Sequence, residues 1–376
     1  MLTQRQRVLA VLNGQAMDRF PVAVPYIMLL QTDHWCELTG QPAWTYWDWL
    51  HQDPAEHVVV YADFCRQLPF DIFQPQWAPT RQERENWEVV HQDGKHYSRD
   101  HRTGDLALLK EDLPHASGGP NQTQYVHDQA DADRHLRIRS ATERLESGRY
   151  DFMCEARRAY PDIFIMNGVI GTFYQCTWAV GETRLFSMLY DEPELIHYMS
   201  KRILEDTLED IRALAAAGCD AIYIDDAMTT RDMISRDFYE RFSMPYVKPM
   251  VDEIHALGKV AVVIYFGGVA DRIAEIASLG ADAISVETSM KSYVNDLGEY
   301  AAVVGDRACL WGNLDPVRVV QDGTDEELRR AIAEQVAIGR RSGKFIISTG
   351  SPITPLTPLA RIQRYIALGR ELGASE

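Results

Sequence analysis

Short apolar runs alternate with long amphipathic stretches over the second half of the chain. Each run is rich in Ile, Val or aromatic residues, is too short for a helix, and is bounded by Gly or Asp, which is typical of buried strands. The predicted strands lie at Ile163–Val169, Ala221–Asp226, Val260–Phe266, Ala283–Glu287, Ala308–Leu314 and Phe345–Gly350. Two further runs, Pro21–Tyr26 and Asp71–Gln74, predict strands upstream.

The stretch between the first two of the six downstream strands predicts the clearest helix. Asp191 can cap it, Pro193 suits its first turn, and Gly218 terminates it. Its apolar positions recur at helical spacing: Ile196, Met199, Ile203, Ile211 and Leu214. The pattern predicts a second helix from Asp237 to Leu257, which Gly258 ends.

Unbroken alternation of strands and helices indicates parallel strands joined by right-handed crossovers. The six downstream and two upstream strands make eight, and eight parallel strands close into a barrel. No GxGxxG or GxxxxGK[ST] motif follows a predicted strand, so a nucleotide-binding open sheet has no support. The sequence therefore predicts an α/β fold, a (β/α)8 TIM barrel that spans residues 1–376 as one domain.

Residues 80–140 interrupt this alternation. Polar and apolar positions alternate around two Gly-containing turns, Asp93-Gly94 and Thr103-Gly104, which predicts a β-hairpin or a small meander. The segment Ala116–Asn121 predicts a loop. Two interpretations stay open: a surface insertion, or a lid over the barrel mouth.

Composition and charge narrow the classes of partner. The chain has 38 basic and 55 acidic residues, a net charge of −17 that repels phosphate backbones and anionic membranes. No apolar run is long enough to span a bilayer, and the N-terminal segment is an amphipathic helix rather than a secretory signal. The six cysteines never form CxxC, which favours free thiols in a reducing compartment. We therefore expect a cytoplasmic protein that binds a small molecule and neither nucleic acid nor membrane.

The ends of the predicted strands carry the side chains most able to do chemistry. In TIM barrels the reacting groups lie at the carboxyl ends of the strands. The candidates there are Asn167, Asp225, Asp226, Tyr265, Glu287, Asn313, Asp315 and Ser351. Carboxylates that share a site raise one another's pKa and attract metal ions or cationic substrates. For Asp226 and Asp315, capping of the following helix is the alternative interpretation.

We expect Asp226, Tyr265 and Glu287 to be catalytic and the other strand-end residues to bind substrate. The N-terminal half is crowded with aromatic residues, among them WTYWDW and Trp77. These side chains are either ordinary core or the wall of a pocket for a flat substrate, and Trp77 is the candidate for substrate binding. No histidine lies at a predicted strand end, so a histidine base is not expected.

Three segments resemble the uroporphyrinogen decarboxylase (URO-D) superfamily. They are AIYIDDAMTTRDMISRDFYERFSMPYVKPMVDEIHALGK, WGNLDPVRVVQDGTDEELRRAI and ISTGSPITPLTPLARIQRYI, and DRFPV and PFDIF fit the family's opening strands. The resemblance is weakest between residues 80 and 150. It implies a (β/α)8 barrel and, by analogy with the barrel decarboxylases, a homodimer.

The chain departs from the true decarboxylases of this superfamily. Those enzymes bind a tetrapyrrole with an arginine-rich opening segment and a late Gly-His-Gly. Here no arginine lies between Pro21 and Arg66, and Gly350-Ser351-Pro352 replaces the late motif. The hairpin segment YSRDHRTGDL is more similar to the methyltransferase branch, whose members move a methyl group between a small substrate, a corrinoid cobalt and an acceptor.

Many methyltransferases of that branch bind zinc through His, Cys and Cys at positions that correspond here to Tyr265, Gly267 and Ser351, none of them a good zinc ligand. A rebuilt metal site would use Asp226, Glu240 and Glu287, which with Tyr265 are also candidate proton donors. The resemblance thus implies a methyltransferase that moves a methyl group from a methoxy or methylamine compound to cobalamin carried by a partner corrinoid protein. The alternatives are a cofactor-free decarboxylase of porphyrin biosynthesis and a non-catalytic binding barrel.

Overall fold

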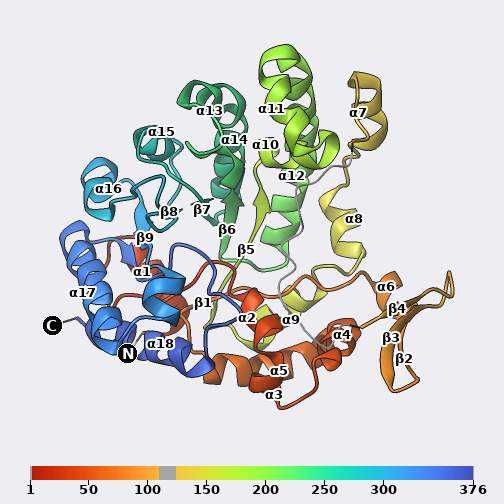
Figure 1. Ribbon diagram of the computed structural model, residues 1–376, viewed down its shortest axis with the longest axis horizontal. Helices are drawn as coiled ribbons and strands as arrows, with labels where there is room; N and C mark the ends of the chain where they lie inside the picture. The colour runs from red at the N-terminus through yellow and green to blue at the C-terminus, as the bar shows by residue number, and fades with distance from the viewer. Residues whose placement is uncertain (1, 110–123, 376) are drawn as a thin grey trace.

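The computed structural model describes residues 2–109 and 124–375, so the predicted loop at Ala116–Asn121 lies outside the described residues. In these ranges the main sheet is parallel and ordered β1-β5-β6-β7-β8-β9-β10. Its strands are β1 Ile72–Phe73, β5 Phe164–Ile170, β6 Ala221–Asp225, β7 Val260–Tyr265, β8 Ala283–Val286, β9 Cys309–Trp311 and β10 Phe345–Ile346. The sheet curls around an axis, as Figure 1 shows.

An extended segment at residues 21–23 closes the curled sheet. Val22 bridges Ile347 in parallel, just beyond β10, and the Ala23 N–H donates to the Ile347 carbonyl at 2.9 Å. On the other side, the Asp71 N–H beside β1 donates to the Val22 carbonyl at 2.9 Å. The segment therefore takes the eighth position, and the predicted (β/α)8 barrel is confirmed.

The barrel interior is filled and closed at one end. Strand side chains alternate between two faces, so in β6 Ala221 and Tyr223 point inward whereas Ile222 and Ile224 pack against the surrounding helices. Helix α1 (Gln4–Leu12), predicted from the N-terminal pattern, packs Val8 onto the inner cluster. Its Arg5 N–H donates to the Asp162 carbonyl just before β5, which places α1 at the amino ends of the strands. The opposite end, where the strands finish, is the mouth.

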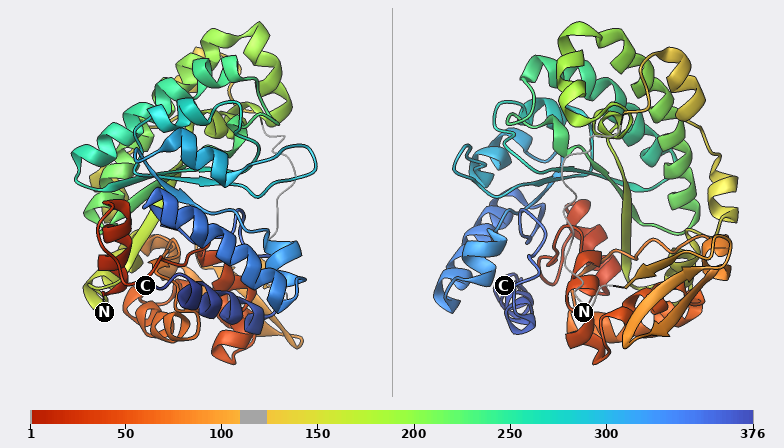
Figure 2. Two further views of the ribbon diagram at one scale, coloured as in Figure 1. Left: turned by 90° about the vertical axis from the view of Figure 1, so that its left-hand side faces the viewer. Right: turned by 45° about the vertical axis from the view of Figure 1, so that its right-hand side comes forward.

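Helices surround this barrel (Figure 2). In the N-terminal half they are α2 Met28–Asp33, α3 Trp35–Thr39, α4 Trp44–His51, α5 Pro54–Gln67, α6 Arg81–Glu85, α7 Gln129–His135, α8 Ala141–Glu146 and α9 Asp151–Ala159. Those that follow β5 are α10 Thr172–Val180, α11 Glu182–Asp191, α12 Pro193–Ala216, α13 Arg236–Phe242, α14 Met244–Ala256, α15 Ile273–Ser278, α16 Leu297–Val304, α17 Asp325–Ser342 and α18 Leu359–Leu372. Short helical turns lie at Ala227–Thr229 and Pro316–Gln321. No helix in the described ranges is long and apolar enough to cross a membrane.

Two details of the predicted helices are wrong. Asp191 is the last residue of α11, and Glu192 is the N-cap residue of α12, with no side-chain cap. The helix predicted from Asp237 to Leu257 is two helices, α13 and α14, which meet at Ser243. Pro245 in the first turn of α14 favours a new helix start there, because proline lacks the N–H that a continuous helix would need.

The insertion forms a small antiparallel sheet, as predicted. Its strands are β2 Trp87–Gln92, β3 Lys95–Asp100 and β4 Leu106–Leu108. Asp93 and Gly94 both have positive φ, the requirement of a tight two-residue hairpin turn. The sheet packs on α4, with the Trp44 ring stacked on His96 at 4.4 Å and His51 on Trp87 at 4.0 Å. Figure 1 places it at the side of the barrel; its role as a lid stays a prediction.

Candidate functional site

Side chains along β6 point alternately to its two faces, so the adjacent carboxylates Asp225 and Asp226 point in opposite directions. Asp225 follows the inward-facing Tyr223, and its Oδ2 accepts a short hydrogen bond from the Tyr26 hydroxyl. The Tyr26 ring lies edge-on to Tyr223, with ring centroids 5.5 Å apart. Asp226 points the other way, toward the helices, and accepts from the Ser243 hydroxyl at 2.5 Å. Asp225, rather than Asp226, is therefore the carboxylate on the inner side of the mouth.

Asp225 and Tyr26 form a hydrogen-bonded pair in which the carboxylate is buried and the tyrosine is partly buried. Burial raises the pKa of Asp225 to about 6, although the hydrogen bond from Tyr26 acts in the opposite direction. Burial also raises the pKa of Tyr26 well above its ordinary value, so the phenol stays protonated. Tyr26 has φ +51°, a strained conformation for a non-glycine residue, and such strain is typical of functional sites.

A second buried polar group lies next to this pair. The Gln74 amide donates to the Tyr223 hydroxyl at 3.0 Å, and Gln74 is fully buried. Its Oε1 has no hydrogen-bond partner among the residues that the structure describes. An unpartnered buried acceptor is costly, so it is a natural contact for a ligand or a water molecule.

Tyr26 lies at the inner end of a cavity, and Asp225 is behind it, bonded to its hydroxyl. The cavity has a volume of about 540 Å³ and runs from the carboxyl ends of β5 and β6 outward to α8 and α12. Its lining includes Tyr26, Trp77, Tyr150, Val169, Gln175 and Tyr223. Trp77 and Tyr150 meet edge to face at 5.3 Å. A cavity of this size with aromatic walls suits a small, flat molecule.

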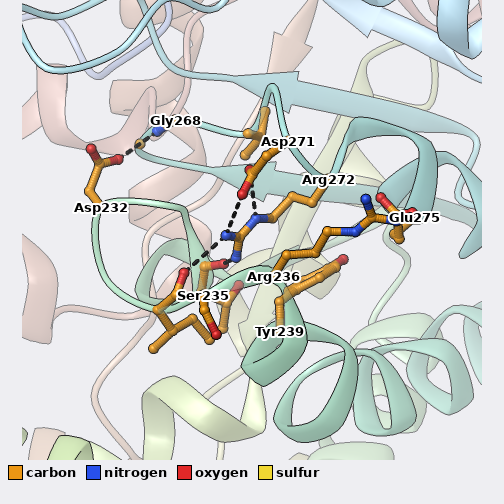
Figure 3. A network of polar contacts seen from close by, with 12 residues as sticks. Asp232, Ser235, Arg236, Tyr239, Gly268, Asp271, Arg272 and Glu275 are labelled. Atoms are coloured by element: carbon orange, nitrogen blue, oxygen red, sulfur yellow. Dashed lines mark hydrogen bonds and ion pairs between the residues drawn. The ribbon is translucent and has the colours of Figure 1, made fainter.

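Arg272 fixes the loop that follows Asp226. Its buried guanidinium donates to the carbonyls of Thr229 at 2.6 Å and Ile234 at 2.9 Å, and lies over the Tyr239 ring (Figure 3). Thr229 in turn donates its hydroxyl to Asp226 at 2.6 Å. Through these contacts Asp226 holds the loop after β6 against α13 and α14.

A second polar cluster occupies the other side of the mouth, after β8 and β10. Glu287 is buried, and its Oε1 accepts from the Ser351 hydroxyl and from the Thr288 N–H. Burial raises the pKa of Glu287. The Asn313 amide donates to the Glu287 carbonyl at 3.2 Å and to the Asn295 carbonyl at 2.9 Å. Glu287, Ser351 and Asn313 are thus brought together, away from Asp225.

Two predicted substrate ligands have structural partners instead. Asn167 is not at a strand end, because β5 continues to Ile170; it is buried, and its amide donates to the Pro75 carbonyl at 3.1 Å. Asp315 caps the helical turn that follows it by accepting from the N–H groups of Val317 and Arg318. For Asp315 the capping alternative is what the structure shows.

Tyr265 is not at the mouth either. Its side chain is fully buried on the outer face of the sheet, where its hydroxyl lies 3.0 Å from that of Tyr239 on α13. The prediction placed it with the carboxylates because it ends β7, but alternation along that strand points it outward.

The predicted metal ligands Asp226, Glu240 and Glu287 do not converge. Glu240 is on α13, 46% exposed and bonded to Arg236, whereas Asp226 and Glu287 are engaged in separate clusters. No group of three His, Cys, Asp or Glu residues in the described ranges could hold a metal ion. The predicted three-carboxylate site is therefore wrong, and these residues do not fit zinc.

Sequence reasoning missed Tyr26 and Gln74. Both are the final residues of predicted strands, Pro21–Tyr26 and Asp71–Gln74. The strand-end rule that selected the downstream candidates would have found them. Neither carries a charge, which is why a search for carboxylates passed over them.

The family model described as uroporphyrinogen decarboxylase (URO-D) matches residues 112–372. Uroporphyrinogen decarboxylase of Chlorobium luteolum is 31% identical over 164 residues, 43% of this chain and 43% of that protein. Methylcobamide:CoM methyltransferase MtbA of Methanosarcina mazei is 25% identical over 227 residues, 59% of this chain and 64% of that protein. The chain thus spans about half the length of the curated relatives it matches.

Among solved structures, a methyltransferase from Methanosarcina mazei aligns over 100% of both chains with a TM-score of 0.69 and 19% sequence identity. At that identity the likeness concerns the fold alone. It agrees with the barrel described above.

Proposed function

The chain belongs to the uroporphyrinogen decarboxylase (URO-D) family, and from that premise we propose that it transfers a methyl group from a small methoxy or methylamine compound to a corrinoid carried by a partner protein. Relatives named as decarboxylases and as a methylcobamide methyltransferase both exist. The observation that carries the choice is Tyr26, which lines the inner end of a cavity of about 540 Å³ and donates its hydroxyl to the buried Asp225.

This pair suits the departure of an oxygen or nitrogen. When a methyl group leaves, the electron pair of the broken bond stays on the donor atom, which then needs a proton. Asp225, with a pKa raised to about 6, holds a proton at weakly acidic pH, passes it to the Tyr26 oxygen, and Tyr26 gives its own proton to the leaving atom. A reduced cobamide on the partner would supply the electron pair that takes up the methyl group.

The cavity charges argue against a polycarboxylate substrate. Such a substrate needs several unpaired cations, but the buried Arg144 is held by Asp206 at 2.5 Å and by Asp210 at 3.3 Å. The opening segment also lacks arginine between Pro21 and Arg66. These features favour a small donor over a tetrapyrrole.

The test is a methyl-transfer assay with free reduced cobalamin as acceptor and a panel of methoxy and methylamine donors. The absorbance of the cobalamin reports its methylation. We expect turnover by the wild-type chain and a loss of about a hundredfold or more in Tyr26→Phe, which cannot relay a proton. Equal turnover by Tyr26→Phe would overturn the relay. Release of CO₂ from a carboxylated tetrapyrrole without cobalamin would favour the decarboxylase. Binding of a donor without turnover would favour the non-catalytic binding barrel.

A further inference from the structure

Arg149 lies where the mouth cavity meets a second hollow. The second hollow, of about 370 Å³, lies between the barrel and the small sheet and is lined in part by Trp87 and Asp100. Trp77 and Arg149 line both spaces. The two side chains therefore form the boundary between them, at the outer end of the cavity.

The other cations of the cavity are already paired. Arg144 is buried and held by two aspartates, Asp206 and Asp210. Arg139 lies 3.8 Å from the same Asp206. The positive charge of these two arginines is therefore balanced by neighbouring carboxylates.

Arg149 differs from them, because its guanidinium makes no ion pair with any described residue. The charge of Arg149 acts on the carboxylate of Glu83. The pKa of Glu83 is lowered mainly by the hydrogen bond from the Thr80 N–H and to a smaller extent by Arg149. Glu83 is itself occupied, since its Oε2 accepts from the Thr80 N–H and hydroxyl at 2.7 and 2.9 Å. The outer end of the cavity is thus lined by Trp77 and by one arginine, Arg149, that no carboxylate of the described residues pairs.

We propose that the methyl donor is a flat monocarboxylate whose carboxylate binds Arg149, whose apolar body lies against Trp77, and whose methyl-bearing end faces Tyr26. This inference rests on the proposed methyl transfer. A guanidinium binds a carboxylate through two parallel hydrogen bonds. A dianionic phosphate fits less well, because Glu143, Asp206 and Asp210 also line the cavity.

The test uses 4-methoxybenzoate and its neutral analogue methoxybenzene, with affinities measured by titration calorimetry on the full chain without cobalamin. We expect 4-methoxybenzoate to bind at least about tenfold more tightly than methoxybenzene. Arg149→Gln should remove that preference, and Arg149→Lys should restore part of it. Arg158→Gln, an exposed arginine on α9 that is not among the cavity residues, is the matched control and should change nothing. Since the Arg149 side chain is exposed, its variants should unfold at the wild-type temperature.

Binding and turnover separate the two proposals. Arg149-dependent binding of 4-methoxybenzoate without methyl transfer would support the carboxylate site and count against the proposed reaction. Methyl transfer with equal kcat/KM for the anionic and neutral donors, unchanged in Arg149→Gln, would overturn the carboxylate site and leave the reaction standing. No preference of the wild-type chain for the anionic probe would overturn the inference directly.

Discussion

Each side of the barrel mouth carries a buried carboxylate bonded to a hydroxyl, but the surroundings of the two carboxylates differ. On the β5–β6 side, the buried carboxylate Asp225 is bonded to the hydroxyl of Tyr26; on the β8–β10 side, Glu287 is bonded to the hydroxyl of Ser351. Tyr26 of the first pair lines the mouth cavity, whereas neither Glu287 nor Ser351 is among the residues that line the two cavities described above. A Cβ added at Gly350 would lie 2.1 Å from the Thr288 nitrogen, which shows how closely the second side is packed.

The comparison teaches that a perturbed carboxylate marks a reaction site only where the group bonded to it lines a cavity that a substrate can enter. Both carboxylates are raised in pKa by burial. The Glu287 cluster instead ties together the loops after β8, β9 and β10, because Asn313 and Ser351 both bond to Glu287. We therefore interpret the β8–β10 side as support for the mouth and the β5–β6 side as its reacting face.

The largest expected effect separates these two sides directly. Asp225→Asn should lower methyl transfer by about a hundredfold or more, since the amide cannot supply the proton. Glu287→Gln, the matched change on the other side, should lower it by less than about threefold. The measurement is kcat/KM with free reduced cobalamin and the best methoxy donor, with circular dichroism as the check on folding. A larger loss in Glu287→Gln than in Asp225→Asn would reverse our assignment of the two sides.

The next effect is on stability and depends on pH. Because the pKa of Asp225 is raised from 3.8 to about 6, the folded state binds this proton more tightly than the unfolded state. The free energy of unfolding therefore falls as pH rises from about 4 to about 6, by roughly 3 kcal/mol for this group. Urea unfolding of the wild-type chain and Asp225→Asn should show the variant gaining stability relative to wild type over that window. A constant difference between pH 4 and 7 would rule out the raised pKa.

A smaller effect is expected at Asp226, the residue that follows Asp225. Ser243→Ala removes the hydroxyl that donates to the buried Asp226, whose Oδ1 already has no partner in the described part of the chain. Leaving a buried carboxylate less well bonded should cost about 2 kcal/mol of unfolding free energy. Urea unfolding is again the measurement, and Ser243→Thr, which keeps a hydroxyl, is the control. Methyl transfer per folded molecule should fall less than in Asp225→Asn; the reverse order would return Asp226 to the catalytic role that the sequence indicated.

The barrel could be predicted because its information is local. Each strand is a short apolar run with its own boundaries, so the order of elements follows from the pattern alone. The side chains at the mouth depend on something less local, namely the face on which each strand finishes. Asp225 and Asp226 are adjacent, and only the inward position of Tyr223 decides which of them enters the barrel. Asn167 was misplaced for a different reason: β5 continues three residues beyond it to Ile170, so Asn167 lies inside the sheet, where its amide donates to the Pro75 carbonyl.

Helix breaks and caps were the other source of error. The break at Ser243 lies in a stretch whose apolar spacing continues across it, and Pro245 was the available signal. The break has a consequence for the site, because it brings the Ser243 hydroxyl onto Asp226. Because Asp226 is bonded to Ser243, it cannot act with the distant Glu240 and Glu287. The three carboxylates therefore do not form the metal site that the sequence predicted.

The smallest expected effect tests that last point. Glu240 is half-exposed on α13, and its partner Arg236 also bonds to Glu275, so Glu240→Gln should leave both the urea midpoint and methyl transfer unchanged within error. Elemental analysis of the purified chain completes the experiment. If Asp226, Glu240 and Glu287 held a zinc ion together, Glu240→Gln would lose zinc that the wild-type chain retains, and methyl transfer would fall with it. We expect equal metal content in both, because a carboxylate bonded to an arginine on the outside of a helix is not placed to join a site inside the mouth.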